Sequence, residues 1–221
     1  MTASAVSSAV DPPYECATCP RLRDYILRWR DKEPEWFNGP VETWSEPGGS
    51  DKVKLLIVGL APGLRGANRT GRPFTGDFAG DLLYETLLRF GFATGSYGAS
   101  PEDSLQLRKC AITNAVRCVP PDNKPVGAEI NNCRQYLEST IASFKNLRAI
   151  VTLGKISHDS TVRTLGQKPS QAVFGHGAVA EIADLQVFSS YHCSRYNTNT
   201  RRLTPEMFQD VFRNVSNFLE K

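Results

Sequence analysis

VKLLIVGL, at residues 53–60, is an almost uninterrupted apolar run that ends close to a glycine. A run of this length and character predicts a strand buried inside a parallel sheet, because helices cover both faces of such a sheet. Three further runs have strand character: KCAITNAV at residues 109–116, RAIVTL at 148–153 and LQVFSSY at 185–191. The sequence therefore predicts four buried strands.

Helical patterns lie between and after these runs. We expect helices near residues 78–90, 127–143 and 158–165, and a last helix that starts with Thr204 as N-cap and Pro205 in its first turn. Strands that alternate with helices indicate an α/β protein. The predicted fold is a three-layer sandwich, with a central four-stranded parallel sheet and helices on both faces. Function in such sheets collects beyond the carboxyl ends of the strands.

Length and composition set limits on the organisation of the chain. The 221 residues suit a single domain, which we expect at residues 13–221 after a disordered lead-in at residues 1–12. The net charge is only +3, so any attraction for DNA has to come from local clustering of basic residues. No secretory signal and no long apolar segment is evident, which predicts a cytoplasmic protein that does not enter a membrane.

Four of the six cysteines form two pairs that can converge. Cys16 and Cys19 make a CxxC pair before a helix, while Cys118 follows a predicted strand and Cys133 lies early in the next helix. Four thiolates suit either tetrahedral zinc or an iron–sulfur cluster, and both readings stay open on the spacing alone. A thioredoxin-like redox motif would need a strand before the CxxC pair, and none is predicted there.

The other two cysteines have simpler readings. Cys110 falls inside a predicted strand and is expected to be a small buried apolar residue. Cys193 follows His192 in a loop, where it is either packed away or a reactive thiol.

The loop APGLRGANRTGRPFTG, at residues 61–76, is rich in glycine and is not expected to hold regular structure. Its three arginines could grip phosphates, although a solvated basic loop reads the same way. Asp77 closes the loop just before a helix, a position typical of an N-cap as well as of a catalytic carboxylate. The polar and basic segment at residues 192–202 fits either a wedge that enters a duplex or an ordinary surface loop.

Four stretches in this order resemble the uracil-DNA glycosylase superfamily, and within it the iron–sulfur branch called family 5 or type b. They are GLAPG at 59–63, NRTGRPFTGD at 68–77, ITNAVRCVPP at 112–121 and HCSRYNTNT at 192–200. The resemblance implies that Cys16, Cys19, Cys118 and Cys133 hold a structural 4Fe-4S cluster that has no part in the chemistry.

The resemblance also assigns roles to residues of the motifs. It implies that Phe74 stacks on an extruded base, that Asn114 reads the polar edge of the base, that His192 faces its O2, and that the catalytic carboxylate is Asp77. The remaining implied contacts are with the base at Gly59, Ala61 and Gly63, and with DNA at Arg65, Asn68, Arg69, Arg72, Ser194, Arg195, Tyr196 and Asn197.

The activity implied is that of a monofunctional, monomeric glycosylase that removes uracil from DNA and starts base excision repair. Hydroxymethyluracil, ethenocytosine and hypoxanthine are further expected substrates. The sequence departs from the family at Cys193, where a proline is usual. Other branches carry a polar residue in the first motif, where this chain has Leu60 and Ala61, which cannot ionise.

Two alternatives remain at this stage. One is a relative that traps uracil-containing DNA covalently, but that branch has a histidine in the first loop, and residues 64–70 contain none. The other is a metal-stabilised module for DNA binding or electron transfer without catalysis.

Overall fold

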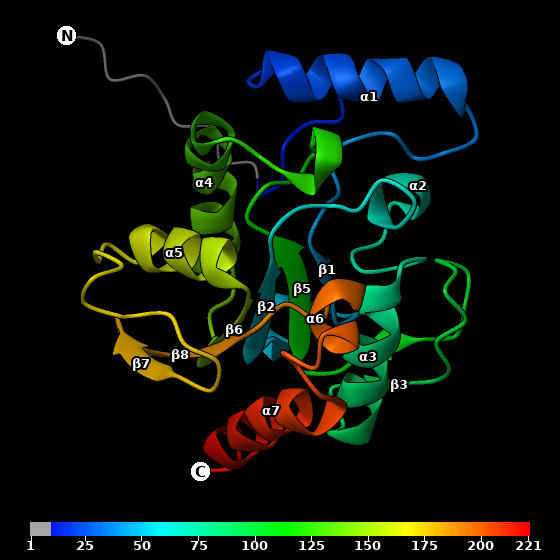
Figure 1. Cartoon of the computed structure of the whole chain (residues 1–221). Helices are drawn as coiled ribbons and strands as arrows, with labels where there is room; N and C mark the ends of the chain where they lie inside the picture. Colours follow the sequence, from blue (N-terminus) through cyan, green and yellow to red (C-terminus); the bar gives the residue numbers. More distant parts are fainter. Residues whose placement is uncertain (1–9) are drawn as a thin grey trace, which may run out of the picture.

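The computed structural model describes residues 10–221 (Figure 1). Its main sheet has six strands, in the order β1 (Trp44–Ser45), β5 (Cys110–Asn114), β2 (Leu55–Gly59), β6 (Ala149–Leu153), β8 (Leu185–Ser190) and β7 (Val179–Ile182). The four central strands are parallel, whereas β1 and β7 pair antiparallel at the two edges. The expectation of a four-stranded sheet was therefore incomplete, because it omitted the two edge strands.

The helices agree in position with the expected ones and add three more. They are α1 (Pro20–Lys32), α2 (Ala67–Thr70), α3 (Phe78–Arg89), α4 (Gly127–Ser143), α5 (Lys155–Thr164), α6 (Arg195–Asn199) and α7 (Pro205–Leu219). A second, two-stranded sheet joins β3 (Ala93–Thr94) to β4 (Gln106–Leu107), and short 3₁₀ turns lie at Ser50–Lys52 and Pro121–Asn123. Among the described residues, no helix is both long enough and apolar enough to cross a bilayer.

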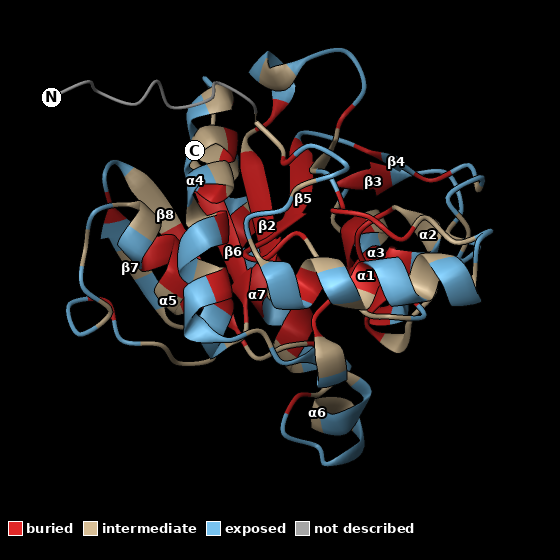
Figure 2. Cartoon of the chain, turned by 90° about the horizontal axis from the view of Figure 1, so that it is seen from above, coloured by how far each residue is buried: buried red, intermediate tan, exposed pale blue. Residues whose placement is uncertain are grey.

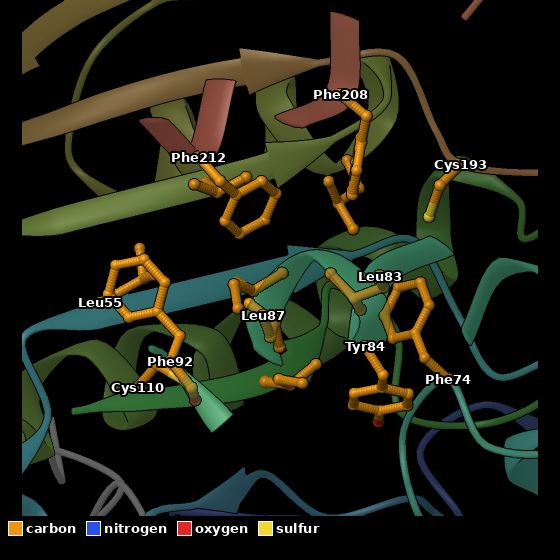
Figure 3. Close-up of a cluster of buried hydrophobic side chains, with 14 of the residues drawn as sticks. Leu55, Phe74, Leu83, Tyr84, Leu87, Phe92, Cys110, Cys193, Phe208 and Phe212 are labelled. Atoms are coloured by element: carbon orange, nitrogen blue, oxygen red, sulfur yellow. The ribbon is translucent and has the colours of Figure 1, made fainter. Parts of the chain in front are cut away.

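Alternate side chains of β2 face opposite layers of the molecule. Leu55 and Ile57 belong to an apolar cluster with α3 and α7, part of which is drawn in Figure 3. Leu56 and Val58 belong to a second cluster with α4 and α5. All four side chains are fully buried, as expected for a strand covered on both faces (Figure 2).

Two segments expected to be irregular contain short helices. The loop at residues 61–76 includes α2, whose last turn closes at Gly71 in the left-handed region (φ 75°). The segment after His192 forms α6, with the Ser194 hydroxyl accepting a hydrogen bond from the backbone N–H of Asn197. Both helices are a single turn long, too short to leave a periodic apolar pattern in the sequence.

The start of the ordered chain also differs from the expectation. Residues 1–9 of the expected lead-in lie outside the described residues. Within it, however, the Asp11 carboxylate lies 2.7 Å from the Arg117 guanidinium and accepts a hydrogen bond from the Thr43 backbone N–H. Asp11 therefore belongs to the folded part of the chain, and a boundary at residue 13 is too late.

The sheet brings three chain segments together at the end where its central parallel strands finish, here called the carboxyl edge. Gly59, the last residue of β2, is paired in register with Asn114, the last residue of β5. His192 lies two residues beyond the end of β8, two strands from β2 in the sheet order. The loops that follow β2, β5 and β8 therefore leave the sheet from the same carboxyl edge.

Candidate active site

A pocket of about 610 Å³ opens at this carboxyl edge. Its walls come from the loop after β2, the first turn of α3, the end of β5, the turn after it, and the segment after β8. The lining includes Ala61, Gly63, Arg65, Phe74, Asp77, Asn114, His192, Ser194 and Arg195, all of them residues singled out in the sequence.

Asn114 and Phe74 form the inner wall of the pocket. The Asn114 side chain is 2% exposed, and its Oδ1 atom is buried without a hydrogen-bond partner in the described structure. A Cβ atom at Gly59 would lie 2.4 Å from Asn114 Oδ1 and 2.6 Å from the Phe74 ring. Glycine at position 59 therefore makes room for both side chains. Because an unpaired buried amide is costly, the pocket is built to receive a polar group there.

Asp77 serves as N-cap of α3 and also faces the pocket. Its Oδ1 accepts hydrogen bonds from the backbone N–H groups of Ala79 at 3.1 Å and Gly80 at 3.3 Å. Oδ2 points the other way, and a Cβ at Gly63 or Gly66 would lie 2.9 or 2.3 Å from it. Burial raises the pKa of the Asp77 carboxyl, an effect only partly offset by the two backbone hydrogen bonds. Asp77 can therefore fill both roles, because Oδ1 caps α3 while Oδ2 faces the pocket.

His192 lines the same pocket, beside the ring of Phe74. The two ring centroids are 6.0 Å apart with planes inclined by 26°. Burial lowers the pKa of His192 to about 4, so the imidazole is neutral at pH 7. The backbone carbonyl of His192 accepts a hydrogen bond from the Asn197 side chain at 2.8 Å, which ties α6 to the pocket wall.

Two residues expected to contact DNA are instead buried in the loop. Asn68 is fully buried, and its Nδ2 donates to Asn38 Oδ1 at 2.8 Å. The Arg72 guanidinium makes two 2.8 Å hydrogen bonds to the carboxylate of Asp103. It also lies 4.7 Å from the centre of the Trp44 ring. The expectation that Asn68 and Arg72 bind DNA is therefore wrong, because both are committed to internal partners.

The other arginines and the α6 segment are more accessible. Arg65 and Arg69 are exposed, although Arg69 Nε donates to the Arg65 carbonyl. Tyr196 is 72% exposed, and the Arg195 guanidinium lies 5.3 Å from the centre of the Phe78 ring at the rim of the pocket. Ser194 and Asn197 use their side chains within the segment, so they shape α6 rather than extend from it.

The turn after β5 adds a pocket residue that the sequence reasoning missed. Asn123 lines the pocket and has a left-handed backbone (φ 56°), as does Asp122 before it (φ 54°). Asn and Asp are favoured in left-handed turns, so a Pro-Asp-Asn stretch reads as an ordinary turn. Only its position beyond the end of a strand at the functional edge could have drawn attention to it.

The four paired cysteines line one small cavity between α1, α4 and the segment after β5, with none of its lining residues shared with the pocket. Burial and the nearby sulfurs of Cys133, Cys16 and Cys19 raise the pKa of Cys118, which reflects their mutual proximity. Among the described residues, however, no three His, Cys, Asp or Glu side chains are close enough to hold a single metal ion.

Cys110 and Cys193 lie in the core. Both are fully buried, with the Cys110 thiol near the Phe92 carbonyl and the Cys193 thiol 3.4 Å from the Ala79 carbonyl. Cys193 packs near Phe208 and Leu83 (Figure 3). Burial raises the pKa of both thiols, so neither is a reactive thiolate at neutral pH.

The fold and the pocket define an α/β protein whose site is built at the carboxyl ends of its central parallel strands. The sequence profile described as the uracil DNA glycosylase superfamily matches residues 47–216. The chain belongs to this superfamily, and within it to the group named type 5.

Three similar proteins named "Type-5 uracil-DNA glycosylase" cover most of the chain. That of Pyrobaculum aerophilum is 37% identical over 91% of this chain and 88% of the relative. That of Mycobacterium leprae is 40% identical over 90% of each chain. That of Thermus thermophilus is 38% identical over 89% of this chain and 90% of the relative. A "Type-4 uracil-DNA glycosylase" of Pyrobaculum aerophilum is 36% identical over 63% of this chain.

Proposed function

We propose that the protein is a monofunctional glycosylase that hydrolyses the N-glycosidic bond of uracil in DNA and so starts base excision repair. The observation that carries this proposal is the Asn114 Oδ1 atom, buried without a hydrogen-bond partner in the described structure, in a side chain that lines the pocket next to the Phe74 ring. An amide offers both a donor and an acceptor, which match the adjacent N–H and C=O groups on the edge of uracil. A base inside a duplex cannot reach such a wall, so it must first be flipped out of the stack.

The reaction replaces the bond between the base N1 and the sugar C1′ by a bond from C1′ to a water oxygen. The electron pair of the broken bond leaves with the base, and a proton is taken up by the base while the attacking water loses one. Positive charge therefore develops on the sugar and negative charge on the base. The pocket has to stabilise both charges.

Asp77 is the group proposed to act on the sugar side. Its Oδ2 atom faces the Gly63–Gly66 stretch of the pocket wall, so it can stabilise the developing positive charge or orient the water. The hydrogen bonds from Ala79 and Gly80 to Oδ1 fix the orientation of the carboxylate.

His192 is the group proposed to act on the base side. A neutral imidazole can donate one N–H to the base O2 as negative charge gathers there, without requiring a protonated residue. The low pKa of about 4 supports a neutral donor over an imidazolium acid. The positions that are polar in other branches are Leu60 and Ala61 in this chain. Stabilisation of the charges that develop on the sugar and the base is therefore assigned to Asp77 and His192.

The pocket lining supports a monofunctional reaction. No lysine is among the residues that line it in the described chain, so no primary amine is placed to form a Schiff base with the sugar. The volume of about 610 Å³ supports additional removal of hydroxymethyluracil, ethenocytosine and hypoxanthine. Action as a monomer is proposed from the resemblance to the superfamily.

The DNA would lie across the mouth of the pocket. Exposed Arg65 and Arg69 are the proposed phosphate contacts on one side, and Arg195 is the contact on the other. Exposed Tyr196 on α6 is the proposed wedge that fills the space left by the flipped base.

The four cysteines would hold a 4Fe-4S cluster with a structural role. They line one cavity, where four thiolates suit a cluster as well as zinc, and the similarity to the type-5 group favours the cluster. The cluster would fasten α1 to α4 and to the turn after β5, and a cytoplasmic location would keep the thiols reduced. Iron analysis and absorbance near roughly 400 nm test this proposal; one zinc per chain and no iron would contradict it.

Incubation with a uracil-containing duplex, followed by alkali, tests the activity. We expect strand breaks only after alkali treatment, as a hydrolysed base leaves an abasic site. Asp77→Asn keeps a good N-cap while removing the charge, so combined with His192→Ala it should abolish excision without unfolding α3. Excision by that double variant at the wild-type rate would contradict the assigned roles. An SDS-stable protein–DNA adduct would instead indicate covalent trapping, and binding without abasic sites would indicate a non-catalytic module.

A further inference from the structure

Phe74 has a backbone conformation that needs external support. Its φ is 51°, in the left-handed region that is sterically unfavourable for a residue other than glycine. A Cβ atom at Gly80 would lie 1.9 Å from the Phe74 carbonyl oxygen, so the first turn of α3 lies directly against this peptide. In this conformation the ring of Phe74 lies beside that of His192, with 6.0 Å between the two ring centroids.

A single tyrosine hydroxyl bridges the backbone between Phe74 and Asp77. Tyr97 Oη donates to the Phe74 carbonyl at 3.3 Å and accepts from the Gly76 N–H at 3.3 Å. A phenolic hydroxyl can fill both roles at once. The bridge joins the Phe74–Thr75 peptide to the Thr75–Gly76 peptide, and Asp77 is the next residue along the chain.

The loop that carries Tyr97 is itself fixed. Tyr97 belongs to the connection between β3 and β4, at residues 95–105. In the same connection Asp103 accepts backbone hydrogen bonds from Gly98 and Leu105 and pairs with Arg72. The Arg72–Asp103 pair joins this connection to the start of the segment that leads to Phe74.

Tyr84 of α3 completes the support from the other side. Its hydroxyl donates to the Pro73 carbonyl, and its ring packs 4.6 Å from the Tyr97 ring. Tyr84 and Phe74 belong to the same buried cluster, in which Figure 3 labels both. Both tyrosines therefore bind carbonyls in the 73–74 stretch, but Tyr97 alone of the two also binds the peptide that leads to Asp77.

We infer that Tyr97 is a positioning residue for the proposed reaction, because its hydroxyl fixes the backbone that aims the Phe74 ring and leads to the Asp77 carboxylate. This inference rests on the proposed function. Tyr97 does not line the pocket, so it acts through Phe74 and Asp77 and not on the substrate.

A double-mutant cycle with Tyr97→Phe and Phe74→Leu tests the inference. The measured quantity is the single-turnover rate of uracil excision at saturating enzyme. Tyr97→Phe should lower this rate roughly fivefold, the equivalent of one ordinary hydrogen bond, with less change in the half-saturating enzyme concentration. In the Phe74→Leu background the same change should cost less, roughly twofold, because the ring that Tyr97 orients is gone and only the effect through Asp77 remains.

The control is Tyr14→Phe, which removes a tyrosine hydroxyl that donates to the Phe37 carbonyl at 2.8 Å, away from the pocket lining. It should leave the rate unchanged. Faster hydrogen exchange at the Gly76 amide in Tyr97→Phe would independently support the bridge. An active wild-type enzyme with Tyr97→Phe at full rate, or with the same loss in both backgrounds, would overturn the inference alone. A wild-type protein that excises no uracil would overturn the proposed function as well.

Discussion

Two segments leave the same edge of the sheet and use their polar side chains in opposite ways. In residues 61–77 after β2, Asn68 and Arg72 turn inward and are buried. In residues 192–200 after β8, Arg195 and Tyr196 turn outward, and α6 projects from the body of the molecule (Figure 2). The first segment is long and rich in glycine, so internal hydrogen bonds from its side chains help to fix its conformation. The second forms a short helix on which Arg195 and Tyr196 stay exposed to solvent.

The largest effect is expected from removing the internal ion pair of Arg72 in residues 61–77, here called the inward segment; residues 192–200 are called the outward segment. Arg72→Met should lower the free energy of unfolding by about 3–5 kcal/mol, because it leaves the Asp103 carboxylate buried without its partner. Arg69→Met, three residues away and exposed, should lower it by less than about 0.5 kcal/mol. Urea unfolding of the two variants measures the difference. Equal losses of unfolding free energy in the two variants would contradict the claim that Arg72, unlike Arg69, is needed for the fold.

The next effect concerns pH and the first residue of the outward segment. The pKa of His192 is about 4 in the folded protein, below the ordinary value of 6.5, so only the unfolded chain takes up this proton between these values. Stability should therefore fall as the pH drops from 6.5 to 4, by up to roughly 3 kcal/mol.

His192→Gln isolates that contribution. Burial raises the pKa of Asp77, which acts in the opposite sense, but Asp77 is present in both proteins. The pKa of Asp103 is lowered to about 2 by Arg72, so its contribution is lost only at more acidic pH. The difference between the urea midpoints at pH 7 and pH 4.5 should be smaller in the variant than in the wild type, and what remains includes His176, whose pKa is also lowered by burial. An unchanged pH dependence would show that His192 is not buried in its neutral form.

A smaller effect is expected from shortening the side chains of α6. Tyr196→Ala should weaken binding to a uracil-containing duplex roughly tenfold, which is about 1.4 kcal/mol, if the ring fills the vacated stack. The melting temperature of the Tyr196→Ala protein should equal that of the wild type, because the ring is 72% exposed. Fluorescence anisotropy at fixed salt measures the affinity. A drop in melting temperature without a loss of affinity would assign Tyr196 to the fold instead.

The smallest effect is expected at the two exposed arginines of the inward segment. Arg65→Ala and Arg69→Ala should each weaken DNA binding only a few-fold at moderate salt. Each should also reduce the slope of log affinity against log salt by about 0.9, the value for one phosphate contact. A slope equal to that of the wild type would place that arginine outside the DNA interface.

The core of the fold could be predicted from the sequence because apolar runs mark buried strands. β1 is two residues long and β7 alternates between exposed and partly buried side chains, so neither leaves such a run. The cysteine pairs were predicted to converge, because Cys118 follows a strand and Cys133 lies in the next helix, and in the structure the four cysteines line one cavity.

The pocket was predictable only in part. Phe74, Asp77, Asn114 and His192 meet as the resemblance implied. The burial of Asn68 and Arg72 depends on Asn38 and Asp103, which are 30 and 31 residues away in the chain. Residue type alone does not say whether an asparagine or arginine faces a partner or the solvent. Asn123 could not be predicted as a pocket residue for a similar reason, because the sequence does not distinguish an asparagine that only forms a turn from one that also lines a pocket.

The most direct test of the central claim is the single-turnover rate of uracil excision by Asn114→Leu. Leucine matches the size of asparagine but removes the amide whose Oδ1 is buried without a partner. The account predicts a loss of roughly a hundredfold or more in rate, with a melting temperature equal to or above that of the wild type. An excision rate within a factor of about two of the wild type, from a folded variant, would contradict the claim that this amide reads the base.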